Sequence, residues 1–138
     1  MVRKLTFGFA VLLAAIVAMG FVPQFITATH GEERTMLGLF MISLLDDITH
    51  GLTAAAMLAA SLHSRRASLV ALTAFGWYYG LDAVFYLTYG LFNDKPWLAD
   101  IMLNAPHVAT SAVMLATVYW WAPREGVAVG GRYAAATA

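Results

Sequence analysis

Asp46-Asp47-Ile48-Thr49-His50 interrupts an apolar segment that runs from about residue 36 to residue 60. If this segment is a helix inside a membrane, each of its three ionisable side chains costs roughly 2.5–3.5 kcal/mol to insert. Such residues usually face the protein interior and mark a functional site. Asp82 and His107 stand at corresponding places in the next two apolar segments. We therefore expect the fold to be built around one polar cluster.

The composition is typical of a membrane protein. Of the 138 residues, 61% are hydrophobic and only 12% are charged, whereas soluble domains are about 45–50% apolar and about 25% charged. The formal net charge is zero, which argues against nucleic acid as a partner. The absence of cysteine excludes thiolate nucleophiles and cysteine metal sites. The lipid bilayer is the expected partner, together with further copies of the chain or a larger membrane complex.

Four apolar stretches are long enough to cross a bilayer, which takes about 20 residues. The first stretch is longer than the apolar part of a signal peptide, which is about 7–15 residues, so we expect an uncleaved helix. Residues 27–34 are predicted to form a polar loop, and residues 124–138 a flexible cytoplasmic tail rich in Gly and Ala. The sequence thus predicts an all-α, four-helix transmembrane bundle in a single domain, residues 1–123, with helices over residues 5–26, 35–62, 67–92 and 97–121.

Basic residues are distributed unevenly between the two sides of the predicted bundle. One side carries Arg34 and Lys95, and the other carries six basic residues. By the positive-inside rule, both termini are cytoplasmic. We expect a multi-pass protein of a bacterial inner membrane or an equivalent plasma membrane. The six residues are Arg3, Lys4, Arg65, Arg66, Arg124 and Arg132.

The polar residues of the last three predicted helices lie at similar depths. At a rise of 1.5 Å per residue, Asp47, Asp82 and His107 each lie about 15–16 Å from the outer end of their helix. Residues three or four apart share a helix face, so the polar side chains form stripes that must face the bundle interior. The stripe on the fourth helix is Asp100, Asn104, His107 and Ser111, and the stripe on the third includes Tyr79, Asp82 and Tyr86.

A metal site is the first hypothesis for this layer. Carboxylate and imidazole groups are ordinary ligands of zinc, iron and manganese. Asp47, His50, Asp82 and His107 would ligate one divalent ion, and Asp46 and Asn104 would orient the ligands. Asp100, Ser111, Tyr79 and Tyr86 would support the site. Such a metal would act on a hydrophobic or membrane-resident substrate, although the sequence leaves open whether the protein is an enzyme.

Three alternatives remain beside the metal site. The same Asp and His residues are typical of a proton or ion relay in a small transporter or channel subunit. His50 and His107 would also suit the axial positions of a b-type haem, although the carboxylates nearby argue against it. In the third alternative, the polar groups simply pair across helices and fix the packing. Gly76 and Gly80 form a GxxxG pair, which predicts close helix packing but no particular partner helix.

Overall fold

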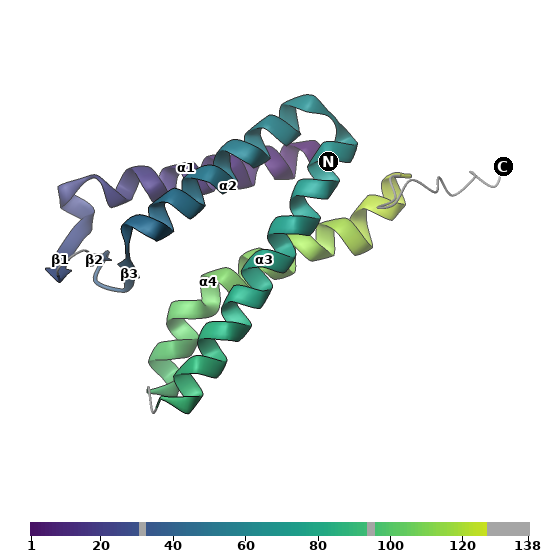
Figure 1. Cartoon of the computed structure of the whole chain (residues 1–138). Helices are drawn as coiled ribbons and strands as arrows, with labels where there is room; N and C mark the ends of the chain where they lie inside the picture. The colour runs from purple at the N-terminus through teal and green to yellow at the C-terminus, as the bar shows by residue number, and fades with distance from the viewer. Residues whose placement is uncertain (31–32, 94–95, 127–138) are drawn as a thin grey trace. The chain divides into compact units, whose positions relative to one another are not determined.

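The computed structural model describes residues 1–30, 33–93 and 96–126. They fall into two compact units, which we describe separately: one holds Met1 and Arg3–His63, and the other holds Val2 and the chain from Ser64 onward. The described chain is mostly helical, with four α-helices and a small three-stranded sheet (Figure 1). Lys95, Arg132 and the predicted tail from residue 127 lie outside the described residues.

The first unit contains a small sheet that the sequence analysis did not predict. Its elements are α1 (Val2–Gly20), the short 3₁₀ helix η1 (Pro23–Phe25), β1 (Ile26–His30), β2 (Glu33–Met36), β3 (Phe40–Ile42) and α2 (Leu44–His63). β2 pairs antiparallel with both β1 and β3. The prediction of an all-α fold is therefore wrong for this segment. Residues 27–30 and 33–34 of the expected loop lie in strands, as do residues 35–36 and 40–42 of the expected helix over residues 35–62.

Local sequence explains the sheet. The segment is rich in β-branched residues, among them Ile26, Thr29 and Thr35, which favour extended backbone. Between β2 and β3, Leu37 and Gly38 both have positive φ, 56° and 72°. Two successive residues with positive φ suit a tight antiparallel hairpin, and a glycine takes this conformation at little cost. The hairpin stops any helix from running through residues 33–42.

Helices α1 and α2 are held together at one end by Arg3. Its Nε donates to the carbonyl oxygen of Ser61 at 2.6 Å, and its Nη2 donates to that of Leu62 at 3.0 Å. Both carbonyls belong to the last turn of α2, where backbone acceptors lack helical partners and a cation is favourable. The beginning of α1 therefore lies at the end of α2, and the two helices run in opposite directions (Figure 1).

The second unit is a helical hairpin. α3 (Arg65–Phe92) begins after Ser64, whose hydroxyl oxygen accepts from the backbone N–H of Ala67 at 3.1 Å, as an N-cap does. α4 (Trp97–Ala116) continues into a π-helical turn, η2 (Thr117–Trp121), and a 3₁₀ turn, η3 (Ala122–Glu125). The two long helices pack antiparallel (Figure 1). Their bounds agree with the predicted spans over residues 67–92 and 97–121 to within a few residues.

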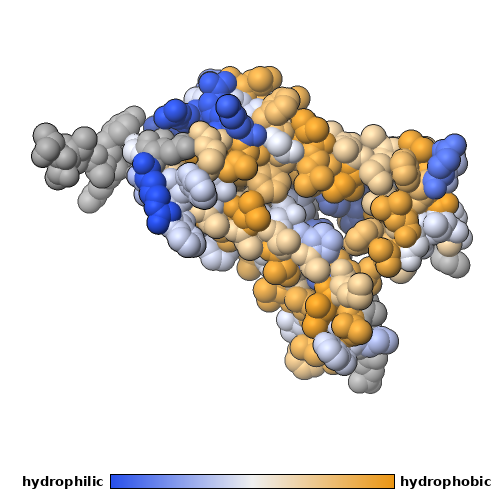
Figure 2. Space-filling model, turned by 180° about the vertical axis from the view of Figure 1, so that it is seen from behind, coloured by the Kyte–Doolittle hydropathy of each residue, from blue (hydrophilic) through white to orange (hydrophobic). Residues whose placement is uncertain are grey.

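Apolar side chains are exposed on all four helices, among them Leu12, Leu52, Leu81 and Ile101. Figure 2 shows hydrophobic residues over most of the face in view. Within the described residues, two segments are both long and apolar enough to cross a membrane, Val2–Gly20 and Asp100–Arg124. By length and composition, therefore, two helices qualify as membrane spans.

Candidate functional site

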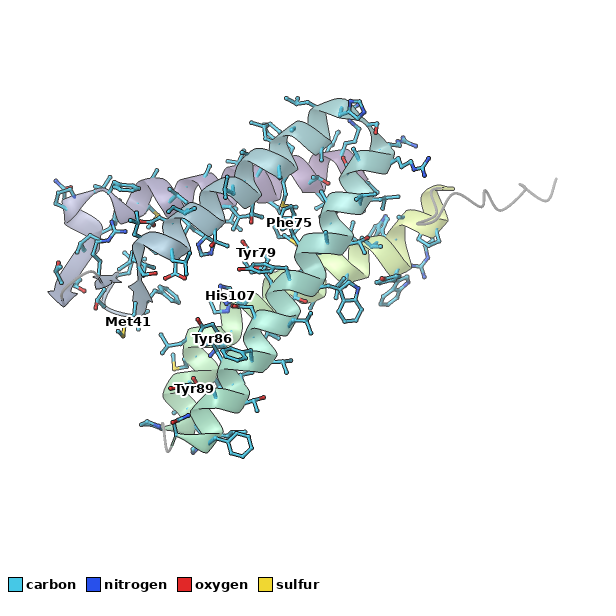
Figure 3. All side chains as sticks on the ribbon, in the orientation of Figure 1. Met41, Phe75, Tyr79, Tyr86, Tyr89 and His107 are labelled. Carbon is cyan, nitrogen blue, oxygen red and sulfur yellow. The ribbon has the colours of Figure 1, made fainter. Side chains whose placement is uncertain are left out.

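Asp82 and His107 meet between α3 and α4. The Oδ2 of Asp82 lies 3.0 Å from the Nδ1 of His107, and their side chains are 23% and 30% exposed. The Tyr79 ring lies beside the imidazole, with ring centroids 5.3 Å apart and planes 32° from each other (Figure 3). Tyr79 itself is only 2% exposed. The structure thus brings together three predicted site residues from two helices.

The polar stripe predicted on α4 faces α3. Asp100, Asn104 and Ser111 are all at least nine-tenths buried. The Asn104 amide donates to the backbone oxygen of Asp100 at 2.9 Å and to its Oδ1 at 3.4 Å. The Ser111 hydroxyl donates across the hairpin to the carbonyl oxygen of Gly76 at 2.7 Å. The stripe therefore lies in the seam between the two helices.

Glycines on α3 make room for this stripe. A Cβ atom on Gly80 would lie 2.7 Å from the Oγ of Ser111, and one on Gly90 would lie 2.6 Å from the Cγ of Asp100. A Cβ on Gly76 would lie 2.8 Å from the Cδ2 of Leu115. The close packing predicted from Gly76 and Gly80 is confirmed, and the structure identifies α4 as the partner helix.

Tyr86 lies further along α3. It is about half-exposed, and its ring packs edge-on against Phe85 with centroids 5.4 Å apart. In Figure 3, Tyr86 and Tyr89 lie on the same side of the hairpin as Tyr79 and His107. The predicted stripe on α3 is thus present, with its buried end at Tyr79.

Asp46 and Asp47 lie in the first turn of α2, not in the middle of a long helix. The Asp46 carboxylate accepts from both the N–H and the hydroxyl of Ser43 at 2.7 Å, and the Ser43 hydroxyl accepts from the N–H of Asp46 at 3.3 Å. This reciprocal arrangement is a capping box. The predicted depth of about 16 Å for Asp47 is therefore wrong, because the helix begins at Leu44 instead of near residue 35.

Asp47 forms an ion pair with Arg34 of β2. The same guanidinium donates to the carbonyl oxygen of Gly20, at the end of α1, at 2.5 Å, and lies over the Phe21 ring at 5.3 Å. Asp47 is buried. Arg34 therefore joins the sheet to the adjoining ends of α1 and α2.

His50 lies one turn further along α2 and is partly buried. Its Nδ1 is 2.7 Å from the backbone oxygen of Asp46, so that nitrogen carries the proton and donates to the carbonyl. The hydrogen bonds of Asp46 and His50 and the ion pair of Asp47 stabilise the beginning of α2.

The four proposed metal ligands belong to two units. Asp47 and His50 lie in the first, and Asp82 and His107 lie in the second. Across the residues that the structure describes, no three or more His, Asp and Glu side chains form a group able to hold a metal ion. A zinc, iron or manganese site built from these four residues stays a prediction, as does a haem on His50 and His107.

Arg34 and Pro106 were not among the predicted site residues. Arg34 was counted only as a loop charge, and nothing in the sequence indicates its pairing with Asp47. Pro106 lies inside α4, immediately before His107. A proline has no backbone N–H, so the carbonyl of Met102 receives no helical hydrogen bond from it. A proline next to an ionisable residue inside a predicted membrane span could have been recognised from the sequence as part of the site.

Aromatic residues gather at the end of α4. The Trp77 Nε1 donates to the hydroxyl of Tyr119 at 3.2 Å, which joins α3 to η2. The Arg124 guanidinium lies 5.1 Å from the centroid of the Trp120 ring and donates to that residue's backbone oxygen at 3.2 Å. These aromatic side chains are more than half-exposed. Exposed Trp and Tyr beside a basic residue are typical of a membrane–water interface.

Comparison with known proteins gives a family but no named relative. No curated protein and no solved structure matches the chain. One family model, described as a domain of unknown function (DUF4383), matches residues 3–122, which include both units and the Asp82–His107 pair. The chain therefore belongs to the DUF4383 family.

Proposed function

We propose that this chain is a multi-pass membrane protein in which the Asp82–His107 pair takes up and releases protons for a coupled transport or channel activity. The observation that carries the proposal is the 3.0 Å contact between the Oδ2 of Asp82 and the Nδ1 of His107. In this proposal all four helices cross the membrane, and both termini are cytoplasmic. The small sheet then lies on the outer face.

Several features support the membrane arrangement. Arg3 links the beginning of α1 to the end of α2, as the proposed topology requires. The outer side carries only two of the eight basic residues, Arg34 and Lys95, as the positive-inside rule expects. Trp97 and Tyr119 are 22 residues apart, about 33 Å along a helix, which suits a hydrocarbon core of roughly 30 Å.

The position of the pair supports a relay. His107 follows Trp97 by 10 residues, and Asp82 precedes Phe92 by 10 residues. Each is then about 15 Å from the end at which α3 and α4 are joined. Ionisable side chains at that depth commonly belong to proton or ion pathways.

The chemistry of the pair suits proton exchange. Imidazole is the side chain whose charge normally changes between about pH 5 and pH 8. A carboxylate beside one ring nitrogen stabilises the imidazolium form and orients the ring. The other nitrogen, Nε2, can then accept a proton from one side of the membrane and release it toward the other. Among the described residues, no third His, Asp or Glu side chain joins Asp82 and His107 in a group able to hold a metal ion, so the proton relay fits the geometry better.

The test is proton flux into liposomes containing the purified chain, driven by a potassium-diffusion potential and followed with an internal pH dye. We expect flux in the wild type and its loss in Asp82→Asn and His107→Gln. Thr88→Ala is the matched control, because Thr88 is exposed on the same helix and its hydroxyl donates to the backbone oxygen of Val84 in that helix. Wild-type flux equal to that of empty liposomes would refute the proposal, as would full flux in both variants.

A further inference from the structure

We infer that Asp100 is a second proton-binding carboxylate, which passes protons to His107 from the end at which α3 and α4 are joined. This inference rests on the proposed function and adds to it an entry point. It is carried by the burial of Asp100 in the seam, by its contact with Asn104 and by the glycine opposite. In the proposed topology this end of the hairpin lies at the outer face.

Asp100 is buried although it lies only three residues into α4. It is 7% exposed, whereas a carboxylate in the first turn of a helix usually remains in water. The electrostatic benefit of the helix N-terminus does not require burial, since it also acts on exposed side chains. An ionisable side chain buried inside a membrane helix is costly, and such groups commonly belong to proton or ion pathways.

The seam is shaped to accept this carboxylate. Gly90 faces it from α3, and a Cβ at that position would clash with the Oδ2 and lie 2.6 Å from the Cγ. Any larger residue at position 90 would push the carboxylate out of the seam. Gly90 thus keeps the acid group between the helices.

The same stripe continues from Asp100 to the proposed relay. Asn104 is 6% exposed and hydrogen-bonds to Asp100, and His107 follows it by three residues on the same helix face. The seven residues from Asp100 to His107 span about 10 Å, which is too far for a direct transfer. Asn104 cannot release a proton itself, but its amide can hold water in the seam. The proton would then move from bulk water to Asp100, through hydrogen-bonded water to His107, and onward.

The experiment compares the rate of proton entry in the liposome assay among variants of the full chain. Asp100→Asn should slow flux by about tenfold or more, which is at the lower end for loss of a positioned proton donor. Asp100→Glu should restore most of the rate. Asp100→Ser keeps a small polar group opposite Gly90 without an acid, so it should be as slow as Asp100→Asn and gives the same test if that variant does not fold.

Two readouts separate a relay from a structural role. A small permeant acid such as azide should accelerate Asp100→Asn and Asp100→Ser, because it replaces the missing donor, but it should not restore Asp82→Asn. The ¹⁵N NMR titration of His107 should keep its wild-type midpoint in Asp100→Asn. A slow variant that neither azide nor Asp100→Glu restores would overturn the inference.

The outcomes also distinguish the two proposals. If Asp82→Asn abolishes flux while Asp100→Asn and Asp100→Ser retain the wild-type rate, the relay stands and the role of Asp100 is refuted. If Asp82→Asn and His107→Gln both leave flux unchanged, the proposed function fails, and with it the inference.

Discussion

The Asp46 carboxylate accepts hydrogen bonds from both the backbone N–H and the hydroxyl of Ser43, each at 2.7 Å. This pair fixes where α2 begins. The residues before it belong to β3, which ends at Ile42. The Asp46 carboxylate therefore caps the N-terminus of its own helix, α2.

Replacing Ser43 with Ala should destabilise the start of α2. The substitution removes the hydroxyl that accepts from the Asp46 N–H, and loss of an N-cap costs about 1 kcal/mol. Amide hydrogen exchange in the first turn of α2 should accelerate, while exchange in α3 stays unchanged. Thr49→Ala is the control, since the Thr49 hydroxyl donates to the Leu45 carbonyl of the same helix. Equal exchange in wild type and Ser43→Ala would show that the cap contributes nothing.

Arg34→Met should destabilise the first unit more than Asp47→Asn does. The methionine variant leaves the buried Asp47 carboxylate without its cation, a loss of up to about 3 kcal/mol, and also frees the Gly20 carbonyl. Asp47→Asn removes the charge and keeps a polar side chain near the guanidinium. Thermal unfolding in detergent measures both effects. The double variant should lose less stability than the summed losses of the two single variants, because each single variant already removes the same ion pair. Losses that add exactly would contradict a direct pair.

Two features of the site follow from general rules of helix geometry and could be predicted from the sequence. The stripe of Asp100, Asn104, His107 and Ser111 was predicted correctly because residues three and four apart share a face in any helix. Asp82 and His107 were predicted to lie at similar depth on neighbouring helices, because helices joined by a short turn pack together. Their direct contact was not predicted.

The sheet was not predicted because its strands are short and partly apolar. Residues 36–42 continue the hydrophobic character of the helix that follows, so their composition concealed the hairpin. The Ser43-x-x-Asp46 spacing was a readable sign of a helix start. The pairing of Arg34 with Asp47 depends on the path of the sheet, and no local pattern predicts such a path.

Alanine at the seam glycines should destabilise the α3–α4 hairpin. Gly90→Ala forces the Asp100 carboxylate to move, and Gly80→Ala displaces the Ser111 hydroxyl; overpacking of this kind costs about 1–3 kcal/mol. Gly51→Ala in α2 is the matched control. A Cβ there meets no atom within 4 Å, so it should raise stability by about 0.5–1 kcal/mol.

Thermal unfolding of the three glycine variants checks this prediction. The double variant Gly90→Ala/Asp100→Ala should recover part of the loss, since removing the carboxylate makes room for the new methyl group. A Gly90→Ala protein as stable as the wild type would contradict the close approach of α3 to Asp100.

Metal analysis distinguishes the relay from the metal site predicted by sequence. If Asp82 and His107 exchange protons, the purified wild type should contain no zinc, manganese or iron at one ion per chain, and His50→Ala/His107→Ala should match it. Preparation without chelators keeps any native ion in place. Stoichiometric metal in the wild type that is lost in the double variant would instead establish the metal site, and a Soret band with iron would indicate haem.

Pro106→Ala should make α4 more stable and the relay slower. Alanine restores an N–H that can bond the Met102 carbonyl, and a proline inside a helix costs about 3 kcal/mol relative to alanine in water. The gain in a membrane is smaller where other groups satisfy that carbonyl. Pro23→Ala is the control: Pro23 is the first residue of η1 and follows Val22, which is extended. Its missing N–H therefore has no helical partner to lose, so the unfolding temperature of this variant should not rise. In Pro106→Ala, the added hydrogen bond makes α4 harder to bend beside His107, the proton-exchanging residue. Flux in liposomes that contain this variant should therefore fall, while the midpoint of the ¹⁵N titration of His107 stays unchanged. Higher stability with full flux would show that the proline in α4 plays no part in proton exchange.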